Sequence, residues 1–328
     1  MTLQIPLTIF LTGGSGFIGS NFINYLFDNC PDISIINYDA LTYAANQKAL
    51  TQQKNNPNYH FIHGNICDLP TVTDAITTTN PDIIINFAAE SHVDRSITDA
   101  SPFISTNIQG VYNLLEICRK HDDLKFIQIS TDEVYGTLGP DGFFTEASPI
   151  KPRSPYAASK ASADLLTLAW HETYGLPVNI TRCTNNYGPW QHPEKLIPMT
   201  IQRCLQKEKI PVYGNGLNVR DWIHVSDHCS GIATVMQNGK VGEVYNIGSK
   251  NEWKNLDLVK KIINITRDLT GDPGVSENLI SFVPDRQGHD FRYAIDPDKI
   301  TRELSWCPKI TFKEGLVKTI RWYLKQQE

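Results

Sequence analysis

Short apolar runs alternate with helical patterns along the first half of the chain. Runs rich in β-branched residues, which we predict to be strands, lie at residues 7–13, 34–39, 59–65, 82–91, 125–133 and 178–186. Near-continuous apolar strands are typical of a parallel sheet that is covered on both faces. Between two of them, Val111, Leu115 and Cys118 recur at helical spacing, and Leu114 widens the stripe. The alternation of strand and helix predicts an α/β protein with a doubly wound parallel sheet.

After about residue 185 this alternation gives way to segments punctuated by Pro and Gly, such as NYGPWQHPEK and VYGNGLNVRDW. We therefore expect residues 1–185 to form the sheet domain. Residues 186–328 are expected to form mainly a smaller, mixed α/β substrate-binding lobe, with segments at about 219–250 returning to the first domain. The opening MTLQIPLTIFLTGG has no basic start and runs into glycines. We predict a buried first strand there rather than a signal peptide.

Composition and charge argue against several classes of partner. The 328 residues are 41% hydrophobic and 20% charged, which is ordinary for a globular enzyme. The net charge of -5 and the lack of a Lys/Arg run argue against nucleic acid, because phosphate binding calls for a basic stripe. No stretch approaches the roughly 18 apolar residues that span a membrane. The seven cysteines form no C-x-x-C pair, so we expect most to be buried and the protein to be cytoplasmic.

The first predicted strand is followed by TGGSGFIGS, which opens a helix. Gly14, Gly16 and Gly19 satisfy the dinucleotide fingerprint, and so does the shifted set Gly13, Gly16 and Gly19. Glycines there let the backbone turn tightly and approach a pyrophosphate, whose charge is met by the helix N-terminus. Asp39 ends the next strand, where a carboxylate binds ribose hydroxyls and repels a 2′-phosphate. No arginine follows it, so the sequence predicts a Rossmann domain that binds NAD rather than NADP.

The motif SPYAASK places Tyr156 and Lys160 four residues apart on a helix introduced by Pro155. A free tyrosine titrates near pH 10 and is a poor base at neutral pH. We expect the lysine ammonium, together with a positively charged nicotinamide, to lower the tyrosine pKa by about three units, or roughly 4 kcal/mol. Such a pair alone would suit a simple hydride-transferring enzyme. In isolation it also fits an amphipathic helix with a packed Tyr and a solvated Lys.

The motif STDEVYG adds two adjacent carboxylates, Asp132 and Glu133, after the strand that ends near Thr131. Ligands of open α/β sheets bind at the carboxyl ends of strands, and FAAES and TRCTNNYG end their strands in the same polar way. Three polar strand ends should therefore converge on one crevice, where Thr131 supplies a hydroxyl near the tyrosine. Two acids imply that one protonates a leaving hydroxyl while the other removes a carbon-bound proton. The structural alternative is that Asp132 caps a turn and Glu133 is solvated.

Over nearly its whole length the chain resembles the dTDP-glucose 4,6-dehydratases, which are extended short-chain dehydrogenases/reductases. The resemblance is carried by TGGSGFIGSNF, FAAESHVDRSI, STDEVYG, SPYAASKASAD, TNNYGPWQHPEKLIP, VYGNGLNVRDWIHVSDH, GEVYNIG and DRQGHDFRYAID. The Thr-Asp-Glu triplet and the DRxGHD segment are specific to sugar-nucleotide 4,6-dehydratases. The glycines and the Tyr-x-x-x-Lys pair identify only the superfamily.

The resemblance implies a lyase (hydro-lyase) that dehydrates dTDP-glucose to dTDP-4-keto-6-deoxyglucose. Tyr156 would take the sugar O4 proton while NAD takes the C4 hydride. Glu133 would remove the C5 proton, Asp132 would protonate the departing C6 hydroxyl, and the hydride would return to C6. The two acids thus serve an elimination between two redox half-steps. A homodimer and a place in dTDP-rhamnose biosynthesis are also implied.

The resemblance assigns roles by position. Catalysis falls to Thr131, Asp132, Glu133, Tyr156 and Lys160. The implied NAD-binding residues are Gly13, Gly16, Phe17, Ile18, Gly19, Asp39, Ala40, Leu41, Thr42, Asn65, Ile66, Phe87, Ala88, Ala89, Thr106, Tyr156, Lys160 and Asn186. The residues implied to line the nucleotide sugar are Ser91, Thr131, Asp132, Glu133, Asn185, Lys195, Leu196, Pro211, Val212, Tyr213, Arg220, Asn255, Asp285, Arg286 and His289.

Some positions and alternatives stay open on sequence alone. Asn65 stands where many relatives carry Asp near the adenine, Trp253 has no functional account, and His224 and His228 lack a third ligand, so no metal is expected. A nucleotide-sugar 4-epimerase would share the NAD site but would have no use for the adjacent acids. A non-catalytic NAD-sensing protein would need only the glycine fingerprint. UDP-glucose stays an alternative substrate, because one sequence does not resolve the base pocket.

Overall fold

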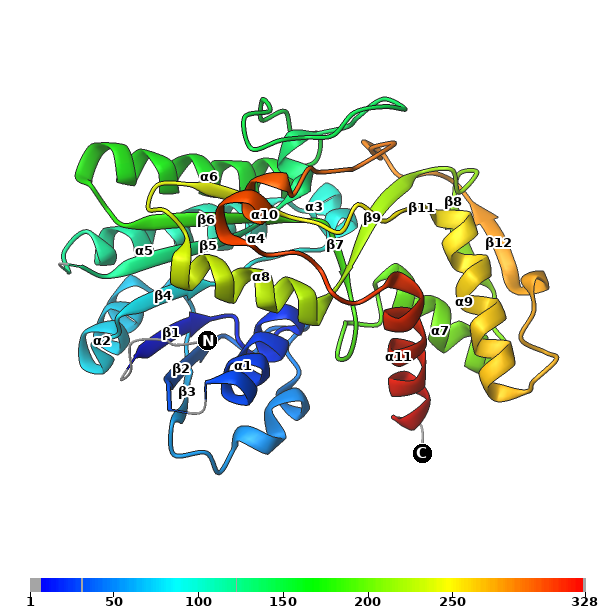
Figure 1. Ribbon diagram of the computed structural model, residues 1–328, viewed down its shortest axis with the longest axis horizontal. Helices are drawn as coiled ribbons and strands as arrows, with labels where there is room; N and C mark the ends of the chain where they lie inside the picture. The colour runs from blue at the N-terminus through cyan, green and yellow to red at the C-terminus, as the bar shows by residue number, and fades with distance from the viewer. Residues whose placement is uncertain (1–6, 31, 122, 327–328) are drawn as a thin grey trace.

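The computed structural model describes residues 7–30, 32–121 and 123–326, in which the strands form one large sheet and two smaller ones (Figure 1). The large sheet has the order β10–β6–β5–β4–β1–β2–β3, and all neighbouring strands are parallel. Its strands are β1 (Thr8–Thr12), β2 (Ser34–Asp39), β3 (Tyr59–His63), β4 (Ile83–Asn86), β5 (Lys125–Thr131), β6 (Val178–Cys183) and β10 (Val244–Ile247). The predicted doubly wound α/β fold is confirmed. The part of the predicted first strand at residues 1–6 lies outside the described residues.

Helices cover both faces of the large sheet, because successive side chains of a strand point to opposite faces. In β1, Ile9 and Leu11 join one core, whereas Phe10 between them joins the other. The helices of the first face are α1 (Phe17–Asn29), α8 (Val225–Asn238) and α10 (Asp298–Leu304). The helices of the second face are α2 (Leu69–Thr79), α5 (Val111–Cys118) and α6 (Pro155–Tyr174). The strands of the large sheet are therefore buried from both sides, which explains their apolar character, except the edge strand β3, whose residues are partly or fully exposed.

The predicted helical stripe of Val111, Leu114, Leu115 and Cys118 is buried in the second core. The helical segment is longer than the pattern indicated, because the π-helical turn η2 (Ile104–Gly110) leads into α5 without a break. Other short elements are η1 (Gln47–Gln53), α3 (Val93–Thr98), α4 (Ser101–Phe103), η3 (Asp132–Tyr135) and η4 (Glu277–Leu279). Of the cysteines, Cys30, Cys118, Cys183, Cys204 and Cys229 are buried, as predicted for most of them.

A smaller lobe lies at one end of the large sheet (Figure 1). Its mixed sheet has the order β11–β9–β7 and consists of β7 (Asn185–Tyr187), β9 (Val219–His224) and β11 (Glu252–Lys254). The parallel strands β8 (Ile210–Tyr213) and β12 (Ile280–Val283) form a separate pair. The lobe is completed by α7 (Leu196–Gln206), α9 (Asn255–Thr270) and α11 (Phe312–Lys325). Trp222, Leu258 and Leu316 are buried in its core.

Two expectations about the lobe boundary differ from the structure. The predicted strand at 178–186 is interrupted at Thr184, so that β6 stays in the large sheet while β7 pairs with β9 of the lobe. The segment at 219–250 is divided, since β9 stays in the lobe and only α8 and β10 return to the large sheet. Local periodicity indicates a strand but does not specify its partner, because strand pairing is a long-range choice.

Candidate active site

The carboxyl ends of β1, β2, β4 and β5 open onto a cavity of about 510 Å³ that extends into the smaller lobe. All the residues predicted for catalysis, NAD or the nucleotide sugar lie on its lining except Leu41, Asp132 and Asp285. Leu41 has a φ of 51°, and its N–H donates to Asp39 Oδ1 at 2.7 Å. Asp285 is exposed and lies 2.6 Å from the Nδ1 of His289. Leu41 and Asp285 thus contact residues of the cavity lining, Asp39 and His289 respectively, without lining the cavity themselves.

The glycine loop has no room for side chains. A Cβ on Gly13, whose φ is +71°, would lie 2.5 Å from the backbone nitrogen of Ala88, and one on Gly19 would lie 2.5 Å from the carbonyl oxygen of Gly13. Gly16 is the N-cap residue of α1, so no side chain caps this helix, and the first turn of α1 carries no acidic residue. The free N–H groups of this helix end therefore suit an anionic ligand, as a dinucleotide pyrophosphate would be.

Asp39 is buried at the end of β2 and ties the glycine loop to the segment after it. Its Oδ2 accepts the N–H of Ser15 at 2.8 Å, while its Oδ1 accepts the N–H of Leu41. Burial raises the pKa of Asp39, although the two backbone bonds oppose this. Each carboxylate oxygen has a second lone pair, so both can still accept a ligand hydroxyl. The glycine loop at residues 13–19 forms a cradle with no room for side chains, and together with the Asp39 carboxylate this cradle fits a dinucleotide with free ribose hydroxyls.

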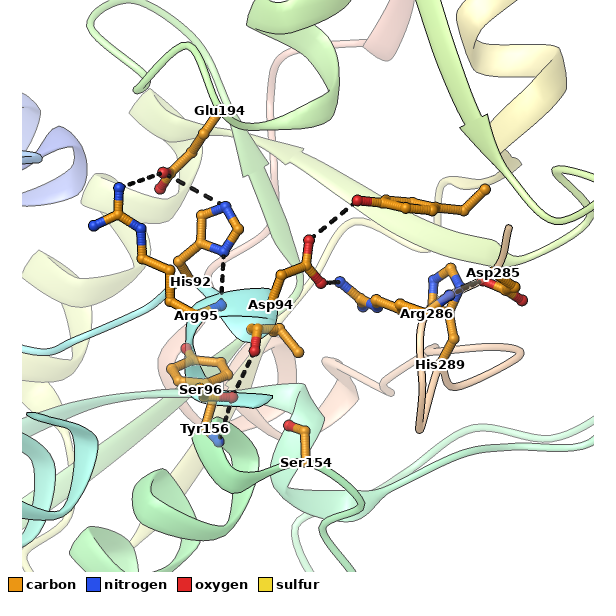
Figure 2. Close-up of polar contacts among 12 residues, drawn as sticks. His92, Asp94, Arg95, Ser96, Ser154, Tyr156, Glu194, Asp285, Arg286 and His289 are labelled. Carbon is orange, nitrogen blue, oxygen red and sulfur yellow. Dashed lines mark hydrogen bonds and ion pairs between the residues drawn. The ribbon is translucent and has the colours of Figure 1, made fainter. Parts of the chain in front are cut away.

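Tyr156 is positioned by the first turn of α6. Pro155 has no N–H to satisfy, Ser154 accepts the N–H of Ala157 at 3.1 Å, and Ser96 Oγ of α3 accepts the N–H of Tyr156 at 3.2 Å (Figure 2). One turn later, Lys160 Nζ donates to the carbonyl oxygen of Ile129 at 2.6 Å. Helix α6 is thereby fixed to both α3 and β5.

The lowering of the Tyr156 pKa was predicted for the side chain beside both Lys160 and a positively charged nicotinamide, and the protein's own side chains do not produce it. Burial and the neighbouring Glu133 raise the pKa of Tyr156 well above its usual value, and hydrogen bonding with Thr131 only opposes this. Burial also lowers the pKa of Lys160 to about 8. Proximity along a helix suggested a stabilised phenolate, but the cost of burying charge outweighs it. The predicted lowering of the Tyr156 pKa therefore depends on the charge of the nicotinamide.

The adjacent acids differ in environment. Thr131 caps the short helix η3, with its Oγ1 accepting the N–H of Glu133 at 3.3 Å. Asp132 lies behind the cavity lining and is 2% exposed, and its Oδ2 has no partner among the described residues. Burial raises the pKa of Asp132 well above the usual range of a carboxyl, and the nearby Glu133 and Asp221 raise it as well, so the protonated form is favoured. Its Oδ1 lies 3.4 Å from the Thr131 hydroxyl, which does line the cavity.

Glu133 lines the cavity and faces several cations. Burial raises its pKa, whereas Arg286, Arg220 and Lys195 lower it. These cations favour the carboxylate form that a base requires. The pair therefore offers a buried acid beside a more readily ionised base, and this separation of environments is a recognised sign of acid and base roles.

The lobe side of the cavity carries surplus positive charge. Arg220 is 5% exposed and donates to the carbonyl oxygens of Val219 and Asp290, at 2.7 and 2.9 Å. Lys195 Nζ donates to the carbonyl oxygen of Ser91 at 3.0 Å. Neither cation forms an ion pair within the described part of the chain. Unpaired guanidinium and ammonium groups in one cavity suit an anionic ligand such as a diphosphate.

Comparison with known proteins decides the family. The family model described as GDP-mannose 4,6 dehydratase matches residues 10–319. The chain belongs to the GDP-mannose 4,6-dehydratase family. Low-salt glycan biosynthesis protein Agl12 of Haloferax volcanii is 50% identical, over 98% of this chain and 100% of the relative. The dTDP-glucose 4,6-dehydratase of Escherichia coli is 48% identical, over 98% of this chain and 95% of the relative.

A solved structure shows the same relationship. The dTDP-glucose 4,6-dehydratase of Bacillus anthracis, in complex with NAD, has a TM-score of 0.89 and 47% identity, covering 98% of this chain and 97% of that one. The resemblance to the dTDP-glucose 4,6-dehydratases that the motifs indicated is thus confirmed over nearly the whole chain.

Sequence reasoning missed a set of polar cavity residues on and around α3 of this 4,6-dehydratase family member (Figure 2). His92 Nε2 lies 3.5 Å from Glu194 Oε2, and Tyr43 donates to Glu194 Oε1 at 3.2 Å. Asp94 accepts from Tyr213 at 3.2 Å. The available signal was FAAESHVDRSI itself, in which polar residues follow a strand end, although Ser91 was the only polar residue singled out there.

Other residues have structural explanations. His228 Nδ1 lies 2.9 Å from Asn186 Oδ1, and His224 caps α8 by accepting the N–H of Ser226. Trp253 stacks on Phe312 with ring centroids 5.3 Å apart, which explains it by packing in the lobe. Within the described ranges, no cluster of three His, Cys, Asp or Glu residues could hold a metal ion. The helices of the same ranges include none with the length and apolar character needed to cross a membrane.

Proposed function

We propose that this protein is an NAD-dependent dTDP-glucose 4,6-dehydratase that forms dTDP-4-keto-6-deoxyglucose. The observation that carries the proposal is the placement of two adjacent acids: Asp132 is buried behind the cavity lining, where its pKa is raised, and Glu133 lines the cavity near Arg286, Arg220 and Lys195, which lower its pKa against the effect of burial. An epimerase or an NAD sensor has no use for such a pair. Relatives named dTDP-glucose 4,6-dehydratase support the thymidine nucleotide over UDP.

The residues that would hold NAD are those of the glycine loop, Asp39 and the strand ends beside them. Bound NAD supplies a reversible hydride acceptor and the positive charge that Tyr156 needs. Its fit rests on the cradle at Gly13 and Gly19, where a Cβ would collide with backbone. Asp39 leaves no place for a 2′-phosphate, because a buried carboxylate would repel it.

The protein's own groups then divide the proton transfers. Tyr156 accepts the sugar O4 proton, with Lys160 and Thr131 holding its surroundings. Glu133 removes the C5 proton, which the 4-ketone makes acidic. Asp132 gives its proton to the C6 hydroxyl as water departs, so that each proton lost by substrate or acid has a defined acceptor. Arg220, Arg286 and Lys195 bind the diphosphate.

Product identity tests the proposal. The purified protein is incubated with dTDP-glucose or UDP-glucose in deuterated water, without added NAD, and products are identified by NMR and mass spectrometry. We expect a 4-keto-6-deoxy sugar from dTDP-glucose, with solvent deuterium at C5, because the C5 proton exchanges through Glu133. A galactose-configured product would establish the epimerase instead, and NAD binding without any turnover would establish the sensor.

We also propose a homodimer formed through α5 and α6, which lie side by side on one face of the sheet (Figure 1). Their outer surface exposes Tyr112 (38%), Leu165 (55%) and Tyr174 (52%), an apolar set that a second copy would cover. Light scattering should give twice the chain mass, and Leu165→Glu should halve it. A wild-type monomer at micromolar concentration would refute the dimer.

The remaining parts of the proposal concern context. The scattered free cysteines support a cytoplasmic enzyme, and the product suits dTDP-rhamnose biosynthesis. The NAD-binding domain would comprise residues 1–185 with α8 and β10 added, and the substrate-binding domain most of residues 186–328.

A further inference from the structure

We propose that Asp94 is a displaceable counter-ion, which holds Arg286 and Tyr213 until the diphosphate of the substrate takes its place. This rests on the proposed function, which assigns Arg286 and Tyr213 to the nucleotide sugar. Asp94 lies in the first turn of α3, and it is a positioning residue because it acts through these two neighbours rather than on the reacting atoms.

Asp94 connects the two halves of the cavity. Tyr213 donates to Asp94 Oδ2 at 3.2 Å, and Arg286 Nη1 lies 3.5 Å from Asp94 Oδ1 (Figure 2). Tyr213 ends β8 and Arg286 follows β12, both in the smaller lobe, whereas α3 follows β4 of the large sheet. All three side chains line the cavity. A ligand that enters the lobe side therefore meets this bridge.

Arg286 is held loosely. A charge-assisted hydrogen bond normally measures about 2.7–2.9 Å, which is shorter than the 3.5 Å contact with Asp94. Among the described residues, Arg286 Nε is buried without a hydrogen-bond partner, and so is Asp94 Oδ1. A guanidinium offers five donors, so most of the binding capacity of Arg286 is unused. The contact between Arg286 and Asp94 is therefore easily replaced when a better acceptor for the guanidinium binds.

A diphosphate is that better acceptor. It presents several anionic oxygens that match the guanidinium fork, whereas the Asp94 carboxylate makes one long contact. Arg286 already acts on Glu133, together with Arg220 and Lys195. Asp94 therefore partly neutralises Arg286, and the contact between them has to break when the diphosphate of the substrate binds Arg286. Removing the Asp94 charge should consequently tighten binding.

The test compares Asp94→Asn, which keeps the shape of the side chain, with the wild-type holoenzyme. Titration calorimetry gives the Kd for dTDP, and steady-state kinetics give KM and kcat for dTDP-glucose. We expect Kd and KM to fall about two- to fivefold, the range of a partly exposed ion pair, with kcat changed by less than about twofold. Asp94→Ala serves as a second variant. Glu208→Gln, which breaks an exposed pair with Arg203 on α7, is the matched control and should change neither constant.

A double-mutant cycle completes the experiment. In an Arg286→Gln background, Asp94→Asn should no longer tighten dTDP binding, because the partner of Asp94 is gone. Unchanged or weaker binding in both Asp94 variants would overturn the proposal, and so would tightening that persists without Arg286. A wild-type protein that neither binds dTDP nor converts dTDP-glucose would refute the proposed function instead.

Discussion

The hydroxyl of Ser96 on α3 holds the backbone of Tyr156 on α6, so the loss of this hydroxyl should lower both stability and activity. Ser96 is 1% exposed; its Oγ accepts the N–H of Tyr156 at 3.2 Å and donates to the carbonyl oxygen of Val93 at 2.6 Å. In Ser96→Ala the Tyr156 N–H becomes a buried donor without a partner. Such a group costs about 1–3 kcal/mol, so the free energy of unfolding should fall by that amount.

Activity should fall as well, because Tyr156 loses one of the bonds that fix its backbone. A displacement of the order of 1 Å at a reacting group costs up to about 10²-fold in rate, so we expect kcat to fall about 10- to 10²-fold. Ser96→Thr keeps the hydroxyl and should restore most of the rate.

Denaturant unfolding and single-turnover kinetics measure the two effects of Ser96→Ala. The matched control is Ser162→Ala on α6, the helix that carries Tyr156, where the partly exposed hydroxyl donates to the carbonyl oxygen of Ala158 at 2.9 Å. This control should change stability and rate little. If Ser96→Ala behaved like Ser162→Ala in both measurements, the bond to Tyr156 would have no positioning role.

Four further predictions concern the acids and bases of the cavity. Tyr156→Phe should reduce turnover by about 10²–10⁴-fold, since phenylalanine cannot accept the O4 proton, and near-normal turnover would identify another base. Asp132→Asn should slow water loss by a similar factor while C4 oxidation survives, whereas Glu133→Gln should also stop the exchange of the C5 hydrogen. NMR in deuterated water distinguishes the two variants. Elimination at the wild-type rate in both would refute the acid–base assignment. The pKa of Asp132 is higher in the folded protein than in the unfolded chain. As the pH rises above about 4, Asp132 ionises in the unfolded chain first, and this lowers the free energy of unfolding of the wild type. Asp132→Asn removes this ionisation, so its free energy of unfolding should depend less on pH in that range. Lys160 has a pKa of about 8, so its ammonium is lost above that pH and kcat/KM should decline there; Lys160→Arg should move this limb to higher pH, and an unmoved limb would assign it to another group.

The sequence by itself determined the strands of the large sheet and pointed to the polar residues that line the cavity. Continuous β-branched runs specify strands buried on both faces, and the glycines of TGGSGFIGS specify a turn without room for side chains, because both signals are local. The polar strand ends, with Thr131, Asp132 and Glu133 after β5, predicted the crevice for the same reason.

Tertiary structure decided how those residues behave. The pKa values of Tyr156 and Asp132 both rise well above their usual ranges, mainly because the folded chain buries these side chains, and burial cannot be read from helical spacing. The division of residues 219–250 between two sheets, and the contacts of α3 with Tyr213 and Tyr156, likewise join segments far apart in the chain. Local patterns carry no information about such partners, because they are selected by packing of the whole fold.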